Sequence, residues 1–126
     1  MIVLDASVLI AHLDASDTHH DAATGLLLDV ADEDLVASPL TLAEVLVGPA
    51  RAGVLDRAEA ALRQLSVVPV PLPDDAPVRL ATLRAATGLK LPDCCVVLAA
   101  EQVGAVVATF DDRLRGVARE RGLDPD

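Results

Sequence analysis

The stretch MIVLDASVLI, residues 1–10, begins with a short aliphatic run, Ile2 to Leu4, that ends at an acidic residue, Asp5. Three further short runs of β-branched or aliphatic residues follow along the chain, at 35–37, 67–70 and 105–108. Runs of this length and composition, separated by longer segments, are typical of β-strands. The chain is therefore expected to contain four short strands.

The segments between these runs carry apolar residues at helical spacing. Three amphipathic faces follow this spacing: Ala22, Leu26, Leu27 and Val30; Leu42, Val45 and Leu46; and Leu55, Ala58, Leu62 and Leu65. Two more helices, over 74–87 and 92–103, are expected between the third and fourth strands. Strands that alternate with helices form a parallel sheet covered on both faces. The predicted fold is α/β, a three-layer α/β/α domain with a mainly parallel sheet of four or five strands.

The length and composition fit a single folded unit. A chain of 126 residues has the usual size of one domain, and 52% of its residues are hydrophobic, which is ample for a core. Prolines gather after the third strand, but helical spacing resumes at Leu80, so this segment is interpreted as a turn and not as a linker. One domain over residues 1–126 is expected.

No segment indicates a membrane span or an export signal. The longest apolar run, Cys94 to Ala100, is far shorter than the roughly 20 residues that cross a bilayer. The N-terminus lacks the charged start and long apolar stretch of a signal peptide. A cytoplasmic protein without membrane contact is expected.

The charge and the scarcity of aromatic residues limit how the protein can bind nucleic acid. Twenty acidic residues against ten basic ones give a net charge of −10, which disfavours binding by attraction to phosphate alone. Phe110 is the only aromatic residue, so the usual platform for base stacking is missing from the composition. A nucleic-acid substrate would have to be held by shape, arginines and metal ions.

Four acidic residues occupy positions from which they can converge. Asp5 ends the first strand, Asp111 follows the last strand, and Glu44 lies one or two turns into the helix after the second strand. The carboxyl ends of parallel strands share one edge of the sheet, where ligands bind. Asp93 lies in the first turn of the helix that leads into the fourth strand and joins the group if this helix starts over the same edge. These acids are expected to line one crevice.

Each acid also has a structural interpretation. Asp93 follows a proline at a helix start, where an acid suits the positive end of the helix dipole. Thr41 and Glu44 match a capping box, and Asp5 and Asp111 are possible N-caps. Four carboxylates at one edge are nevertheless costly unless cations neutralise them. The combination therefore favours a cation site over four independent caps.

The ligand chemistry of the four acids indicates the metal and the reaction. Hard oxygen ligands without a matching histidine or cysteine set favour Mg²⁺, or Mn²⁺ in its place, over zinc. Ions bound in this way activate water and stabilise the leaving oxygen in phosphodiester hydrolysis. The sequence thus predicts a metal-dependent nuclease in which both the catalytic and the metal-binding residues are Asp5, Glu44, Asp93 and Asp111.

Four motifs resemble those of PIN-domain ribonucleases, and specifically the VapC-type toxins of bacterial toxin–antitoxin pairs. In order along the chain they are VLDASVLIA at 3–11, SPLTLAEVLVG at 38–48, GLKLPDCCVVLAA at 88–100 and VVATFDDRL at 106–114. The resemblance implies that the acidic quartet of the family is Asp5, Glu44, Asp93 and Asp111, with Ser7 and Thr109 supporting it. It further implies Mg²⁺-dependent endonucleolytic cleavage of RNA, a homodimer, and a cognate antitoxin whose tail blocks the site.

The sequence departs from the family pattern at two positions. Cys94 stands where the family often has alanine, and Asp112 stands where a basic or neutral residue is frequent. Asp112 is thus a second candidate for the fourth acid. Asp111 is preferred because it lies two residues after Thr109, as the family pattern T-x-D requires.

The cysteines and histidines have structural explanations. Adjacent Cα atoms lie about 3.8 Å apart, below the roughly 4.4 Å that an ordinary disulfide needs, so Cys94 and Cys95 are expected to be free and buried. His19 and His20 lie in THHD, residues 18–21, which matches a capping box at a solvated helix start.

The basic residues have two interpretations. By resemblance, Lys90 and Arg84 contact RNA phosphate, although isolated surface cations usually have no such role. The arginines of the last helical segment are interpreted as a solvated face or as partners of acids on another chain; they are Arg113, Arg115, Arg119 and Arg121.

Two alternative functions compete with the nuclease interpretation. A receiver-like signalling domain also has an acidic Mg²⁺ pocket, but it needs a lysine at a late strand end, and the only lysine, Lys90, precedes a helix. A PIN scaffold that binds a partner without cleavage is the other alternative. All four acids are present, so nothing in the sequence favours a loss of activity.

Overall fold

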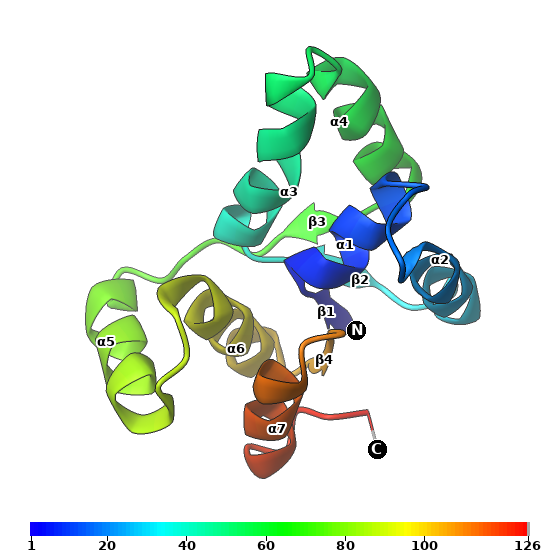
Figure 1. Ribbon diagram of the computed structural model, residues 1–126. Helices are drawn as coiled ribbons and strands as arrows, with labels where there is room; N and C mark the ends of the chain where they lie inside the picture. Colours follow the sequence, from blue (N-terminus) through cyan, green and yellow to red (C-terminus); the bar gives the residue numbers. More distant parts are fainter. Residues whose placement is uncertain (126) are drawn as a thin grey trace.

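The computed structural model of the protein describes residues 1–125. Its strands are β1 (Ile2–Leu4), β2 (Leu35–Ala37), β3 (Val68–Pro69) and β4 (Val106–Ala108). Its helices are α1 (Ala6–Leu13), α2 (His20–Asp29), α3 (Pro39–Arg51), α4 (Leu55–Gln64), α5 (Ala76–Thr87), α6 (Leu91–Val103) and α7 (Asp112–Glu120). The expected alternation of strands and helices is confirmed (Figure 1).

The four strands form one parallel sheet in the order β3-β2-β1-β4. Ile2 of β1 pairs with Leu35 of β2 on one side and with Val106 of β4 on the other. The third strand is shorter than the run at 67–70 predicts. Proline lacks the N–H that continues a ladder, and Pro69 therefore suits only this edge strand.

Side chains of the central strands alternate between two aliphatic cores. Val3 and Val36 pack into a core with residues of α5, α6 and α7. Ile2, Leu4 and Leu35 point to the other face and pack with residues of α1, α2, α3 and α4. The sheet therefore separates two helical layers, as Figure 1 shows, and the three-layer α/β/α architecture is confirmed.

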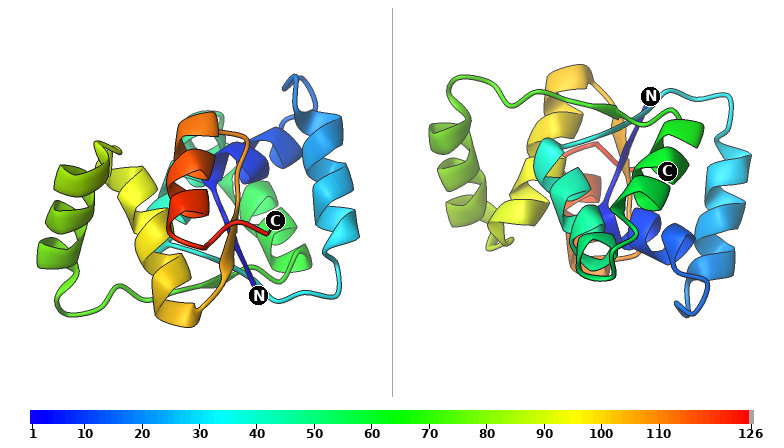
Figure 2. Two further views of the ribbon diagram at one scale, coloured as in Figure 1. Left: turned by 90° about the horizontal axis from the view of Figure 1, so that it is seen from below. Right: turned by 90° about the horizontal axis from the view of Figure 1, so that it is seen from above.

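The order of the strands creates a switch point beside β1. The chain passes from β1 to β2 and β3 in one direction and then returns to place β4 on the opposite side of β1. In both views of Figure 2, α2 and α5 lie at opposite ends of the molecule, with the sheet between them. At their carboxyl ends, β1 leads into α1 and β4 leads into α7. Open α/β sheets bind ligands at such a point.

Helix α6 begins near the switch point, crosses the interior and ends at the opposite edge of the sheet, where it leads into β4. Pro92 suits its first turn, and Gly104 ends it in the left-handed conformation with φ of 66°. Every residue from Cys94 to Ala100 is buried, and both cysteines are free, as expected. No helix within the described residues is long and apolar enough to cross a membrane.

Three local predictions were wrong. Helix α2 starts at His20 and not after Thr18, because the Asp17 carboxylate accepts the His19 N–H at 2.8 Å and forms a turn there. Helix α3 has Ser38 as its N-cap, because Pro39 suits the first helical position; the capping box at Thr41 and Glu44 does not form.

The third error concerns the inner face of α2. Ala22 is exposed, and Ala23 is buried in its place. The other three predicted residues, Leu26, Leu27 and Val30, pack against the core as expected.

Candidate active site

Asp5 is the buried centre of the acidic edge. It follows β1 directly and is only 6% exposed. Its Oδ1 accepts the Ala6 N–H at 2.8 Å, so Asp5 is also the N-cap of α1. Its Oδ2 accepts hydrogen bonds from Ser7 Oγ at 2.9 Å and Thr109 Oγ1 at 2.6 Å. These three hydrogen bonds fix the orientation of the carboxylate.

Ser7 and Thr109 connect the ends of β1 and β4. Their hydroxyl oxygens lie 3.4 Å apart. Ser7 Oγ accepts the Phe110 N–H at 3.1 Å, and Thr109 Oγ1 accepts the Asp111 N–H at 3.0 Å. The two hydroxyls thus hold the β4–α7 connection against Asp5, which is the supporting role that the resemblance implied for them.

Asp111 lies at the start of α7 and also acts as its N-cap. Its Oδ1 accepts the N–H groups of Arg113 and Leu114 at 2.9 and 3.0 Å. Its other oxygen has no hydrogen bond within residues 1–125 and remains available to a ligand. The neighbouring Asp112 side chain is 96% exposed and pairs with Arg115 at 3.4 Å. It therefore points away from the other acids.

Asp93 and Glu44 reach the same edge from two helices. Asp93 is half-buried in the first turn of α6. Its pKa is raised mainly by this partial burial and also by repulsion from Asp5 and Asp111. Glu44 is largely exposed in the second turn of α3, and its pKa is raised by its partial desolvation and then by repulsion from Asp5 and Asp93.

The fold thus brings the four predicted acids into one electrostatic group. Asp5 and Asp93 are its centre, because each repels Glu44 and they repel one another; Asp111 joins through Asp93. No three acidic, histidine or cysteine side chains within residues 1–125 are arranged as a ready-made cage for a metal ion. This arrangement still fits Mg²⁺, which keeps several of its waters and takes only one or two carboxylates directly.

A set of basic side chains flanks the acids at the turn between α5 and α6. Arg84 donates to the Leu89 carbonyl at 2.9 Å, and Arg113 donates to the Gly88 carbonyl at 3.1 Å. Attraction to Lys90 and Arg113 offsets part of the increase in the pKa of Asp93. Glycine suits position 88, since its φ is +72° and a Cβ would lie 2.8 Å from the Arg113 guanidinium, which would then have to shift.

The basic residues are unevenly distributed along the chain. Residues 1–75 contain three basic and thirteen acidic residues, whereas residues 76–126 contain seven of each. The excess negative charge therefore belongs to the first half of the chain. The α5–α6 turn and α7 offer an anionic ligand a more favourable surface than the overall charge of −10 implies.

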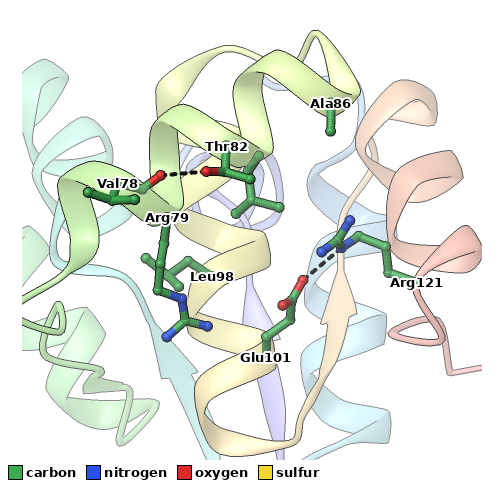
Figure 3. Close-up of a pocket in the computed structure, with 8 residues that line it drawn as sticks. Val78, Arg79, Thr82, Ala86, Leu98, Glu101 and Arg121 are labelled. Carbon is green, nitrogen blue, oxygen red and sulfur yellow. Dashed lines mark hydrogen bonds and ion pairs between the residues drawn. The ribbon is translucent and has the colours of Figure 1, made fainter.

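Two cavities differ in their relation to the acids. One of about 190 Å³ lies between α5, α6 and the residue after α7, and Figure 3 shows the Glu101–Arg121 ion pair at its wall, at 2.7 Å. None of the four acids lines it. Another, of about 450 Å³, lies between α1 and α3 and has Glu44 in its wall; most of its lining is apolar, including Ile10, Val45 and Pro49.

The sequence alone did not indicate three features near the site. Arg113 was expected on a solvated face, but it contacts the α5–α6 turn. Thr41 is fully buried, and its hydroxyl has no hydrogen-bond partner within the described residues. His19 stacks on Phe110, 91 positions away. All three depend on contacts between distant segments, for which no local pattern exists.

A doubly wound parallel sheet with carboxylates at its switch point defines an α/β protein with an acidic ligand site. The chain belongs to the PIN domain family, whose model matches residues 2–120. Family membership leaves the receiver-like alternative without support. A search of curated proteins finds no match.

The fold is also similar to that of a solved structure, a toxin-antitoxin complex from Klebsiella pneumoniae. The TM-score is 0.71 with 23% sequence identity, over 88% of this chain and 87% of that chain. Similarity at this level of identity supports the PIN-like fold.

Proposed function

We propose that this protein is a Mg²⁺-dependent endoribonuclease that acts as the toxin of a toxin–antitoxin pair, with Mn²⁺ as an alternative ion. PIN domains are generally nucleases. The observation that carries the proposal is the convergence of four acids at the switch point, where Asp5 and Asp93 repel Glu44, and Asp5 and Asp111 repel Asp93. Such a group destabilises the fold unless a cation joins it.

Asp5, Glu44, Asp93 and Asp111 would hold the ion. When bound, it supplies a water acidified for attack on phosphorus and a positive charge for the leaving oxygen. Asp5 provides a fixed reference point, because Ser7 and Thr109 hold its Oδ2.

The basic side chains suggest how the RNA backbone approaches. Lys90 is exposed one turn before Asp93, and Arg84 and Arg113 are oriented by the carbonyls of the same α5–α6 turn. Cations at this turn can bind the phosphates that flank the scissile one. We therefore place the RNA along the α5–α6 turn and the start of α7, away from the acidic first half of the chain.

An antitoxin is the proposed protein partner. The structurally similar chain from Klebsiella pneumoniae comes from a toxin-antitoxin complex. In the present protein, the apolar cavity between α1 and α3 opens beside Glu44 and suits an apolar segment followed by a basic side chain. An arginine fork pairs with two carboxylate oxygens and can replace a metal ion there. The toxin is further proposed to be one domain that forms a homodimer, which light scattering can test.

The test of the function is RNA cleavage by the purified protein. Cleavage is expected with Mg²⁺ or Mn²⁺, with poor substitution by zinc and none in excess EDTA. Asp5→Asn and Asp93→Asn should be inactive, while Cys94→Ala, one residue from Asp93, should remain active. Full cleavage in EDTA would exclude the metal mechanism. A folded wild type that binds a partner but cuts no RNA with either ion would instead support the non-catalytic scaffold.

A further inference from the structure

The only aromatic residue of the chain lies beside the acidic edge and has a second ring on its face. The His19 and Phe110 rings are stacked, with centroids 5.0 Å apart and an angle of 20° between their planes. His19 belongs to the connection between α1 and α2, and Phe110 to the connection between β4 and α7. Composition alone predicts no aromatic platform, yet the fold assembles one from two distant residues.

Phe110 is attached directly to the frame of the candidate active site. It lies between Thr109, which holds Asp5, and Asp111. Its own N–H donates to Ser7 Oγ, and that hydroxyl donates in turn to Asp5 Oδ2. The ring is half-buried, so its position is set by the same contacts that position the acids.

His19 is presented from an equally constrained backbone. Its N–H donates to Asp17 Oδ1 at 2.8 Å, and its carbonyl accepts the Ala23 N–H at 2.8 Å. The next residue, His20, has its Nδ1 2.8 Å from the Ala11 carbonyl oxygen, which ties the start of α2 to α1. The backbone that carries the imidazole is thus held at three points.

The imidazole itself is available to a ligand. His19 is exposed, and Phe110 covers one face of its ring. Within residues 1–125 its side chain makes no hydrogen bond or ion pair. The face opposite Phe110 is therefore open to solvent, on a ring that is already aligned with that of the residue before Asp111.

We propose that His19 and Phe110 form a stacking platform for a nucleobase of the RNA substrate, which rests on the nuclease function proposed above. A base on the outer face of His19 extends the two-ring stack to three. Stacking on aromatic side chains accepts every base, because each has a π-face. The platform therefore positions the strand beside the acids and contributes little to the choice among bases.

A purely structural role for the contact makes different predictions. If the stack only fastens the α1–α2 connection to the β4–α7 connection, its loss lowers the melting temperature. If His19 acts by charge on a phosphate, a lysine replaces it and a phenylalanine does not. If it stacks on a base, phenylalanine replaces it, while leucine, which has similar bulk but no ring, does not.

The experiment compares steady-state RNA cleavage by wild type and four variants: His19→Ala, His19→Leu, His19→Phe and His19→Lys. Alanine and leucine are expected to raise KM roughly 5-fold or more, the effect of losing one base stack, with kcat and melting temperature nearly unchanged. Phenylalanine should restore the KM of wild type, and lysine should not. Leu28→Ala is the control, since this side chain is 71% exposed on α2, the helix that His19 precedes.

A binding measurement separates failure of the platform from failure of the proposed function. Single-stranded RNA with 2-aminopurine in place of adenine should lose fluorescence on binding to Asp93→Asn protein, and adding His19→Ala should remove this quenching. If wild type cuts no RNA but the quenching is present, the nuclease proposal fails and the platform stands. Unchanged KM and quenching in His19→Ala, rescue by lysine alone, or a loss that parallels melting temperature would each overturn the platform.

Discussion

Thr109 Oγ1 donates a 2.6 Å hydrogen bond to Asp5 Oδ2 and so joins two residues that lie 104 positions apart. The same oxygen accepts the Asp111 N–H at 3.0 Å. One hydroxyl group therefore sets the relative positions of two of the four acids. The geometry of the candidate active site depends on this contact between the ends of β1 and β4 as much as on the carboxylates themselves.

Thr109→Val should impair the site without removing an acid. Valine has the same shape but can neither donate to Asp5 nor accept from Asp111, so the buried Asp5 carboxylate and the partly buried Asp111 N–H each lose a partner. We expect the free energy of unfolding to fall by about 1–3 kcal/mol and activity by roughly 10- to 100-fold, as for other residues that orient metal ligands. Denaturant titration and RNA cleavage measure the two effects.

The control for this substitution is Thr82→Val on α5. The Thr82 hydroxyl donates to the Val78 carbonyl at 2.8 Å at an exposed position, so its loss should change neither activity nor, by more than a few tenths of a kcal/mol, stability. Equal effects of the two substitutions would show that Thr109 has no special part in the site.

Asp93→Asn should stabilise the metal-free protein while reducing activity. It removes one charge from a group in which Asp5 and Asp111 repel Asp93. We expect the melting temperature in EDTA to rise by about 3 °C, and Mg²⁺ to stabilise wild type more than the variant, since only binding to the folded state adds stability. A variant that melts lower in EDTA and still cuts RNA would show that Asp93 is merely a helix-start acid.

The stability of the metal-free protein should depend on the pKa values of Glu44 and Asp93. Both are raised in the folded state, so the folded chain binds protons more readily than the unfolded chain. The stabilisation that comes from this proton binding is fully present below the ordinary pKa values of about 4. It is lost as the pH rises through the raised pKa values of the folded state. Relative to Glu44→Gln/Asp93→Asn, wild type in EDTA should therefore gain stability on acidification.

Mg²⁺ should reverse this trend, because metal binding requires ionised carboxylates. Thermal melts of wild type and the double variant between pH 4 and pH 8, with EDTA and with Mg²⁺, measure the difference. If the difference in melting temperature between wild type and the double variant in EDTA does not change with pH, the pKa values of these two acids are not raised by folding.

Gly88→Ala should cost more than an equivalent change at another helix end. Gly88 and Gly104 both end helices with positive φ, of 72° and 66°. A Cβ at 104 meets no atom within 4 Å, whereas at 88 it would lie 2.8 Å from Arg113 Nη2. We expect Gly104→Ala to lose about 1 kcal/mol through backbone strain, and Gly88→Ala to lose more and to weaken RNA binding as Arg113 is displaced. Equal losses and equal RNA affinities would exclude a role for this contact.

Inhibition by the cognate antitoxin should weaken as Mg²⁺ rises. A basic side chain that pairs with the acids competes with the ion for the same carboxylates. Titration of the complex at increasing Mg²⁺, with ionic strength held constant, should show a falling affinity. An affinity that saturating Mg²⁺ leaves unchanged would mean that the antitoxin inhibits by another route.

Sequence was sufficient for the features that arise from local order. Short β-branched runs separated by helical spacing predicted four strands, a parallel sheet and two helical layers, all of which are present. Asp5 and Asp111 directly follow strands, so a parallel sheet had to bring them to one edge. Burial of Cys94 and Cys95 followed from their place in an apolar helix.

Tertiary structure decided what depends on contacts between distant segments. Two helices begin at residues other than those that the apparent capping boxes predict. Pro39 occupies the first position of α3, and the Asp17 carboxylate accepts the His19 N–H before α2. The bond between Thr109 and Asp5 and the stack of His19 on Phe110 have no local signal, since each needs the sheet to place two connections side by side. Local order determined which acids could meet; only packing determined which hydroxyls, cations and rings surround them.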